Sequence, residues 1–259
     1  IDGDIRDREA VRKAMQGVSK VVHLAALVSV PESIAQPNLC FDINAHGTQV
    51  VLDEARRSGV RKVVLASSAA VYGDNSNLPL SENEPAAPLS PYGLDKLYAE
   101  QLGRVYQSLY GMKVTALRFF NVFGPRQDPS SPYSGVISIF LERMLAGEDV
   151  NIFGDGSQTR DFVYVKDVVS AIMLSMQSDH AAFQVFNVGC GGQVSVNALY
   201  RTLCELVKPG HAVLYKPLRG ADIVHSEADI TAISTALAYK PEFSFEQGLK
   251  ETLEWQQAG

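Results

Sequence analysis

Short apolar runs alternate with helical stretches along the first half of the chain, and this alternation most constrains the fold. Residues 21–25, 63–66 and 114–117 are almost continuously apolar, as strands covered on both faces are. Between them lie two stretches with helical boundaries, from about 37 to 58 and from 92 to 110, stopped by Gly59 and Gly111. The pattern predicts an α/β fold with a doubly wound parallel sheet.

The composition limits the classes of partner. Of the 259 residues, 46% are hydrophobic and 20% are charged, which is enough apolar material for a sizeable core. The net charge of -6 and the lack of a basic stripe argue against a nucleic-acid binder. No apolar run is long enough to span a membrane. We therefore expect a cytoplasmic protein with neither nucleic-acid nor membrane partners.

The cysteines give no sign of a disulfide framework or a metal site. Cys40, Cys190 and Cys204 lie far apart, their number is odd, and no ligand spacing of cysteine or histidine occurs. We predict three reduced thiols and no bound metal.

The texture of the sequence changes after residue 120, where prolines, glycines and shorter elements become frequent. We divide the chain into residues 1–120, a domain that regains segments from later in the chain, and residues 121–259, a smaller lobe. Within this lobe, apolar residues recur at helical spacing behind Ser195 and from Phe245 onward. Both stripes are expected to be core.

Tyr92 and Lys96 are four residues apart and share one face of the predicted helix. A phenol with a pKa of about 10 is a poor base at neutral pH. A neighbouring ammonium favours the phenolate, so the pair can act as a general base. The spacing by itself is weak, because such pairs also occur on solvated helix faces.

Residues 67–73 form a turn of serines and small residues directly after the strand that ends at Ala66. The carboxyl end of a parallel strand is where α/β enzymes keep their sites. The alternative is a plain turn whose serine hydroxyls satisfy backbone groups. This turn and the Tyr92–Lys96 pair together are more specific than either one.

Several motifs occur in the order and at the spacing of one known family. They are His23-Leu24-Ala25-Ala26, residues 67–73, Tyr92-x-x-x-Lys96, residues 118–125, residues 153–156, residues 160–162 and residues 219–223. With them the chain resembles the extended short-chain dehydrogenase/reductase family, in particular its UDP-glucose and UDP-N-acetylglucosamine 4-epimerases. The resemblance covers essentially the whole chain.

The resemblance implies a Rossmann-type NAD-binding domain at 1–120, a nucleotide-sugar lobe at 121–259, and epimerisation of a UDP-hexose at C4. Tyr92 would take the proton from the sugar 4-hydroxyl while NAD takes the C4 hydride. Lys96 would hold the nicotinamide ribose and lower the pKa of Tyr92, and Ser68 would hydrogen-bond the 4-oxygen. The transient 4-keto sugar would then turn over and receive the hydride on its other face.

The matched positions also imply binding residues. Cofactor contacts are implied at Asp4, Ile5, Leu24, Ala25, Ala26, Ala66, Tyr92, Lys96 and Phe119. Substrate contacts are implied at Ser68, Asn121, Gly135, Val136, Phe153, Arg160, Arg219, Asp222 and Ser226. Apart from the match, arginine suits the oxygens of a diphosphate and a carboxylate suits ribose hydroxyls. Without the match to the family, the charged residues in this set would be interpreted as members of surface salt bridges.

Three features refine the expected activity. Dehydratases and decarboxylases of the superfamily carry an acid just after the hydroxyl residue, where this chain has Ala69 and Ala70, so dehydration is not expected. Gly135 and Ser226 are small at positions that exclude an N-acetyl group when large, so we expect N-acetylated sugars to be accepted. Val28 departs from the lysine or glycine often found there.

Two alternatives stay open. The glycine-rich turn that holds a dinucleotide is not in this sequence, and by the family's spacing about 50 residues would precede Ile1. The chain could be another nucleotide-sugar epimerase, dehydratase or reductase, or a truncated non-catalytic binder of nucleotide-sugars.

By analogy with relatives, helices at 44–58 and 92–110 would pair in a homodimer.

Overall fold

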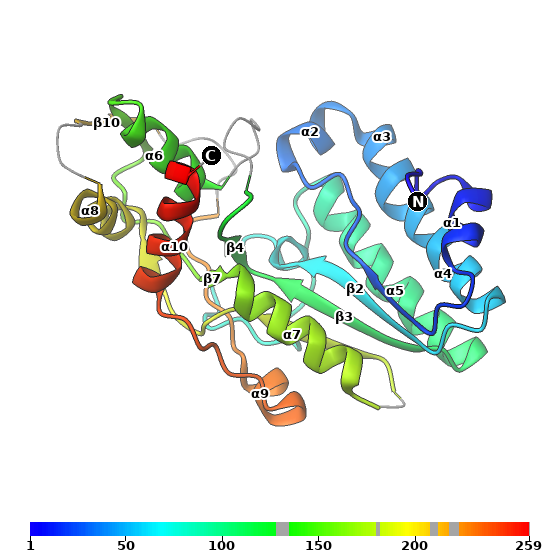
Figure 1. Ribbon diagram of the computed structural model, residues 1–259. Helices are drawn as coiled ribbons and strands as arrows, with labels where there is room; N and C mark the ends of the chain where they lie inside the picture. The colour runs from blue at the N-terminus through cyan, green and yellow to red at the C-terminus, as the bar shows by residue number, and fades with distance from the viewer. Residues whose placement is uncertain (128–134, 180–181, 208–211, 218–222, 259) are drawn as a thin grey trace.

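The computed structural model describes residues 1–127, 135–179, 182–207, 212–217 and 223–258 (Figure 1). At the centre of this described part lies a four-stranded parallel sheet in the order β1-β2-β3-β8. Its strands are β1 (Lys20–His23), β2 (Lys62–Ser68), β3 (Lys113–Phe119) and β8 (Gln184–Val188). The predicted α/β fold with a parallel sheet is confirmed.

Helices cover both faces of the sheet (Figure 1). They are α1 (Arg8–Ala14), α4 (Gly47–Arg57), α5 (Pro91–Tyr110), α7 (Val165–Gln177) and α9 (Thr231–Leu237). Because successive residues of a strand point to opposite faces, each strand serves two cores. Val63 and Leu65 pack with α1, α4 and α5, whereas Val64 and Leu117 pack with α7 and α9.

Helix α5 begins and ends where the sequence predicts. The Ser90 hydroxyl accepts a hydrogen bond from the Gly93 N–H at 3.1 Å, which caps the first turn. Gly111, just after the last residue, has a φ of 68°, a left-handed conformation that glycine adopts without strain. These two signals are local, so the sequence alone locates them.

The predicted helix from about 37 to 58 is present and contains a π-helical turn. After α2 (Val30–Ala35) comes α3 (Pro37–Phe41), then a π-helical turn (Asp42–His46), and only then α4. In this turn the Asn44 amide nitrogen donates to the Leu27 carbonyl at 2.9 Å, and its oxygen accepts from the Leu27 N–H at 2.7 Å. The π turn thus fixes the loop that follows β1, as such turns often do at functional positions.

The second half of the chain builds a second core. Its elements are β4 (Asn121–Phe123), α6 (Val136–Leu145), β5 (Val150–Phe153), β6 (Thr159–Arg160), β7 (Phe162–Tyr164), β9 (Val194–Ser195), α8 (Val196–Leu206), β10 (Val213–Lys216) and α10 (Phe245–Ala258). Leu199, Leu203, Leu249 and Leu253 are buried there, so both predicted stripes are core. From this half, α7, β8 and α9 return to the central sheet. The assignment of cofactor and substrate to separate domains stays a prediction.

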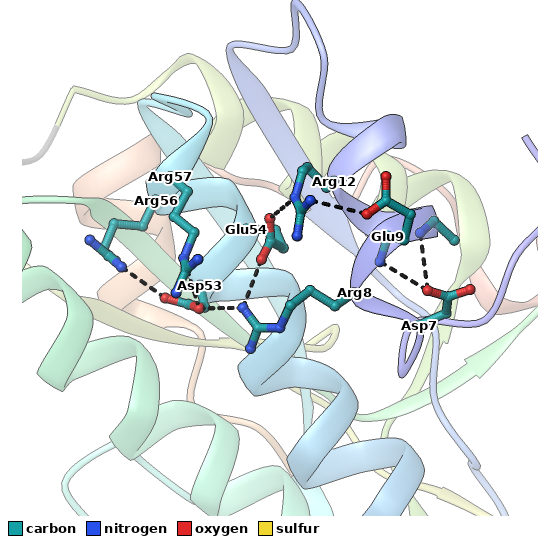
Figure 2. Close-up of polar contacts among 9 residues, drawn as sticks. Asp7, Arg8, Glu9, Arg12, Asp53, Glu54, Arg56 and Arg57 are labelled. Carbon is teal, nitrogen blue, oxygen red and sulfur yellow. Dashed lines mark hydrogen bonds and ion pairs between the residues drawn. The ribbon is translucent and has the colours of Figure 1, made fainter.

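An ion cluster joins α1 to α4 (Figure 2). The Glu54 side chain is fully buried and accepts hydrogen bonds from Arg8 at 2.7 Å and from Arg12 at 3.2 Å. Asp53 beside it pairs with Arg8 at 2.6 Å. Burial alone would raise the pKa of Glu54, but the two arginines bring it below its usual value. The cluster holds α1 against α4.

Three lysines hold the carboxyl end of α7 to the sheet. Lys20, Lys62 and Lys113 stand in register at the amino ends of β1, β2 and β3. Lys20 and Lys62 donate to backbone carbonyls at the end of α7, at 2.6 and 3.3 Å, and Lys113 pairs with Asp179 at 2.9 Å. Positive charge is favourable at a helix carboxyl end. The same three lysines line a cavity of about 570 Å³. Their contacts with the end of α7 give them a structural role there.

All three cysteines are free thiols, of which Cys40 is buried and Cys190 and Cys204 are half-buried. In the described ranges, no three metal-ligating side chains gather as a metal site would require. Over the same residues, no helix combines the length and the apolar character needed to cross a membrane.

Candidate active site

The larger of two adjoining cavities lies at the carboxyl ends of β2 and β3. The predicted residues that line the larger one, of about 370 Å³, are Ser68, Tyr92, Phe119, Asn121, Arg160 and Ser226. Those that line the smaller one, of about 240 Å³, are Asn121, Val136, Phe153 and Arg160. Because Asn121 and Arg160 line both, the two cavities form one cleft.

Ser68 ends β2 and begins a tight turn. Its hydroxyl accepts a hydrogen bond from the Ala70 N–H at 3.1 Å, at the start of a 3₁₀ turn (Ala69–Tyr72). Gly73 closes this turn with a φ of 64°, and a Cβ there would collide with the Ala87 carbonyl. The turn therefore depends on glycine and presents the Ser68 side chain to the larger cavity.

Helix α5 approaches this turn closely because Gly93 has no side chain. A Cβ at Gly93 would lie 2.7 Å from the Ala70 carbonyl oxygen, nearer than such atoms can pack. The approach brings Tyr92, in the first turn of α5, close enough to the Ser68 hydroxyl for that hydroxyl to lower the pKa of the phenol against the effect of burial. Lys96 follows one turn later, and its Nζ lies 5.7 Å from the centroid of the Tyr92 ring.

Burial shifts the pKa of both titratable groups of this pair, in opposite directions. It raises the pKa of Tyr92, and hydrogen bonding with Ser68 opposes the rise. It lowers the pKa of Lys96 to about 8, and the nearby Cys40 and Asp95 oppose the fall. The net direction for Tyr92 is opposite to the lowering expected from Lys96. In the chain alone, burial therefore outweighs the effect that the resemblance assigns to Lys96.

The surroundings of Lys96 fit a dinucleotide. Its Nζ donates to the Ala66 carbonyl at 2.9 Å, and within the described residues this leaves ammonium hydrogens for further acceptors. The loop after β1 supplies an open surface, since Leu24 is 52% exposed, Ala25 is exposed and Ala26 is half-buried. A buried ammonium can donate hydrogen bonds to ribose hydroxyls. A loop of small residues lets a pyrophosphate group approach the protein backbone.

The other two predicted cofactor contacts precede α1. Asp4 forms an ion pair with Arg6 at 2.6 Å, and hydrogen bonds from Arg6 lower the pKa of Asp4 to about 2. Ile5 is half-buried, and its side chain packs against Gly47. Their contact with adenine stays a prediction.

The predicted substrate residues not yet described are Gly135, Arg219 and Asp222. Arg219 and Asp222 lie outside the described residues. Gly135 precedes α6, where a Cβ would lie 3.3 Å from the Gln127 amide nitrogen. The structure thus places Gly135 beside Gln127 and not on the described wall of either cavity. Val28, the departure from the family pattern, lines the larger cavity.

Some lining residues were not predicted. His225 and Leu80 line the larger cavity, and Asn151 and Gln158 line the smaller one. The Nδ1 of His225 lies 2.9 Å from the Thr159 hydroxyl. Its position next to Ser226 could have identified it, whereas the others come from segments that no motif marks.

Comparison with known proteins identifies the family of the chain. Residues 1–189 match the model of the NAD dependent epimerase/dehydratase family. The chain is 37% identical over 236 residues to the UDP-glucose 4-epimerase of Mycolicibacterium smegmatis, covering 91% of this chain and 75% of that protein. More distant relatives, each 30% identical, are named as a UDP-N-acetyl-alpha-D-glucosaminuronate decarboxylase from Bacillus cytotoxicus and a dTDP-glucose 4,6-dehydratase from an Actinoplanes species.

Two solved structures are similar over nearly the entire chain. The UDP-N-acetylglucosamine 4-epimerase of Methanobrevibacter ruminantium, in complex with UDP-N-acetylmuramic acid, superposes with a TM-score of 0.95 at 39% identity, covering 100% of this chain and 82% of that one. The UDP-glucose 4-epimerase of Thermus thermophilus, in complex with NAD, superposes with a TM-score of 0.91 at 33% identity, covering 99% and 84%.

Replacing Lys96 by methionine is expected to stabilise the protein at neutral pH. Folding lowers the pKa of Lys96 from 10.5 to about 8, so burying the charged form costs up to about 3 kcal/mol. Between these two pH values the unfolded chain binds more protons, so wild-type stability rises with pH and the cost fades toward pH 10.5.

Urea unfolding of both proteins at neutral and at alkaline pH measures this difference. Lys96→Met should exceed wild type in free energy of unfolding near neutrality, and the gap should narrow as the pH rises. A variant that is no more stable than wild type at neutral pH would contradict a destabilised buried ammonium.

Proposed function

The chain belongs to the NAD-dependent epimerase/dehydratase family, and we propose that it is a UDP-hexose 4-epimerase. The observation that carries the proposal is that Ser68 and Tyr92 line one cleft and that the Lys96 ammonium lies 5.7 Å from the centroid of the Tyr92 ring. Ala69 and Ala70, which also line the cleft, bring no acid to it.

In the proposed reaction, the Tyr92 phenolate takes the proton of the sugar 4-hydroxyl and gives it back to the 4-oxygen when the 4-keto group is reduced. The Ser68 hydroxyl hydrogen-bonds the same oxygen and holds it opposite Tyr92. NAD, when bound, would supply the acceptor and later the donor of the C4 hydride, with the 4-keto sugar rotated between the two transfers. Lys96 holds a ribose hydroxyl with the ammonium hydrogens that the Ala66 carbonyl leaves over.

The cleft has features that suit a nucleotide diphosphate. Arg160 contributes a guanidinium to both cavities, and Val136 and Phe153 add apolar wall to the smaller one. A guanidinium matches phosphate oxygens, and apolar walls suit the face of a base. We assign the smaller cavity to the nucleotide and the larger one, which contains Ser68 and Tyr92, to the sugar.

Dehydration and decarboxylation are the alternatives that relatives within the family suggest. Elimination of water needs a general acid and a base near the 5- and 6-positions of the sugar. The positions after Ser68 are alanines, so this chain lacks the acid at that place. We therefore favour epimerisation, which leaves the mass of the sugar unchanged.

The central test is turnover of UDP-glucose and UDP-N-acetylglucosamine with added NAD, followed by chromatography and mass detection. We expect galacto products of unchanged mass from wild type. Tyr92→Phe should lose at least about 100-fold in rate, because it removes the proton acceptor. Tyr106→Phe, on the same helix but away from the cleft, is the matched control.

A product lighter by one water would contradict the proposed epimerase activity and indicate a dehydratase. Full activity of Tyr92→Phe would remove Tyr92 from the reaction.

We further propose that the sugar cavity accepts an N-acetyl group because Ser226 is small. Ser226 is buried and lines the larger cavity. Ser226→Tyr should lower the ratio of UDP-N-acetylglucosamine turnover to UDP-glucose turnover at least about 10-fold, because the ring would fill the space of the acetyl group. Ser226→Ala should keep the ratio. An unchanged ratio in Ser226→Tyr would place the selectivity elsewhere.

We also propose a homodimer through α4 and α5. Leu94, Tyr98, Val105 and Leu109 form an exposed apolar stripe along α5 at helical spacing, and an exposed stripe of this kind suits a helix-to-helix interface. Val105→Glu should convert a dimer to a monomer in sedimentation experiments without unfolding the chain. A monomeric wild type at micromolar concentration would contradict the interface.

A further inference from the structure

A buried ion pair lies beneath the turn that carries Ser68. Arg118 of β3 binds Glu100 of α5 through two hydrogen bonds, Nε to Oε1 at 2.9 Å and Nη2 to Oε2 at 2.8 Å. Their side chains are 7% and 1% exposed. Burial alone would lower the pKa of Arg118, but the hydrogen bonds and charge of Glu100 raise it above its usual value. Neither residue lines the described wall of either cavity.

The pair holds both ends of the turn. At one end, the Ser67 hydroxyl donates to Glu100 Oε1 at 2.5 Å. Ser67 and Ser68 are successive strand residues, so anchoring one behind the sheet directs the other toward the cleft. At the other end, the Arg118 guanidinium lies 4.7 Å from the centroid of the Tyr72 ring. The Tyr72 hydroxyl in turn donates to the Asn187 side chain at 2.6 Å.

The same carboxylate also fixes the helix that carries the phenol. Glu100 and Tyr92 both belong to α5, about 12 Å apart along its axis. Glu100 therefore ties α5 to the strand residue that precedes Ser68. The relative positions of the Ser68 hydroxyl and the Tyr92 phenol depend on this one contact as well as on the approach of Gly93.

We propose that Arg118 and Glu100 are positioning residues, which act through Ser67 and Tyr72 to hold the Ser68 hydroxyl opposite Tyr92. An apolar pair of similar volume is often as stable as a buried ion pair. An apolar pair could not, however, accept the hydrogen bond that the Ser67 hydroxyl donates to Glu100. The reaction meant here is the 4-epimerisation proposed above, so the inference rests on that function.

Two variants and two readouts test the positioning role. Ser67→Ala removes one hydroxyl, and Glu100→Gln removes the charge. Each should lower kcat about tenfold with little change in KM, because a displaced hydroxyl costs rate more than binding. Each should also speed amide exchange at Ala70, whose N–H donates to the Ser68 hydroxyl. This exchange is measured without substrate.

The matched control is Glu54→Gln, which neutralises another buried glutamate bound by arginines, in the cluster of Figure 2. It should lower the melting temperature and leave kcat and Ala70 exchange as in wild type. A Ser67→Ala protein with wild-type kcat and wild-type Ala70 exchange would overturn the proposal.

If Glu100→Gln fails to fold, Ser67→Ala decides. If wild type lacks epimerase activity, the proposed function fails, and Ala70 exchange alone still decides whether Glu100 and Ser67 hold the turn.

Discussion

The contact between the first turn of α5 and the turn after β2 is the constraint on which the site depends. Gly93 lets the helix backbone reach the Ala70 carbonyl, where any Cβ would collide. This separation lets Tyr92 line the same cavity as Ser68, and Lys96 follows one turn later with its ammonium near the Tyr92 ring. The sheet supplies the fixed platform, because β2 and β3 run side by side to residues 68 and 119.

Burial changes the pKa of both titratable groups of the Tyr92–Lys96 pair. It raises the pKa of the Tyr92 phenol and lowers that of the Lys96 ammonium, because a buried site disfavours the charged form of each group. A bound cofactor with a positively charged ring would favour the phenolate that the chain alone disfavours.

Local signals made much of the fold predictable. The apolar runs located β2 and β3, and Ser90 and Gly111 located the ends of α5, because caps and continuous apolar strands are properties of neighbouring residues. The Tyr92–Lys96 pair was found in the same way. The pairing of Arg118 with Glu100 was not, since the two are 18 residues apart and meet only when α5 folds back onto β3.

The position of Gly135 shows the same limit. Its small size is visible in the sequence, but which wall it faces depends on how α6 starts and where Gln127 lies. Likewise, the π turn before α4 follows from the bond of Asn44 to a loop 17 residues earlier. Distant partners of this kind leave no periodic pattern, so only the structure reveals them.

The most direct test of the central claim follows the hydrogen at C4. UDP-glucose labelled with deuterium at C4 is incubated with the protein and NAD, and the product is analysed by mass spectrometry and NMR. Removal and return of one hydride within a closed cleft predicts UDP-galactose that retains the deuterium at C4. A galacto product that has lost the label to solvent, or a labelled product lighter by one water, would contradict 4-epimerisation by this route.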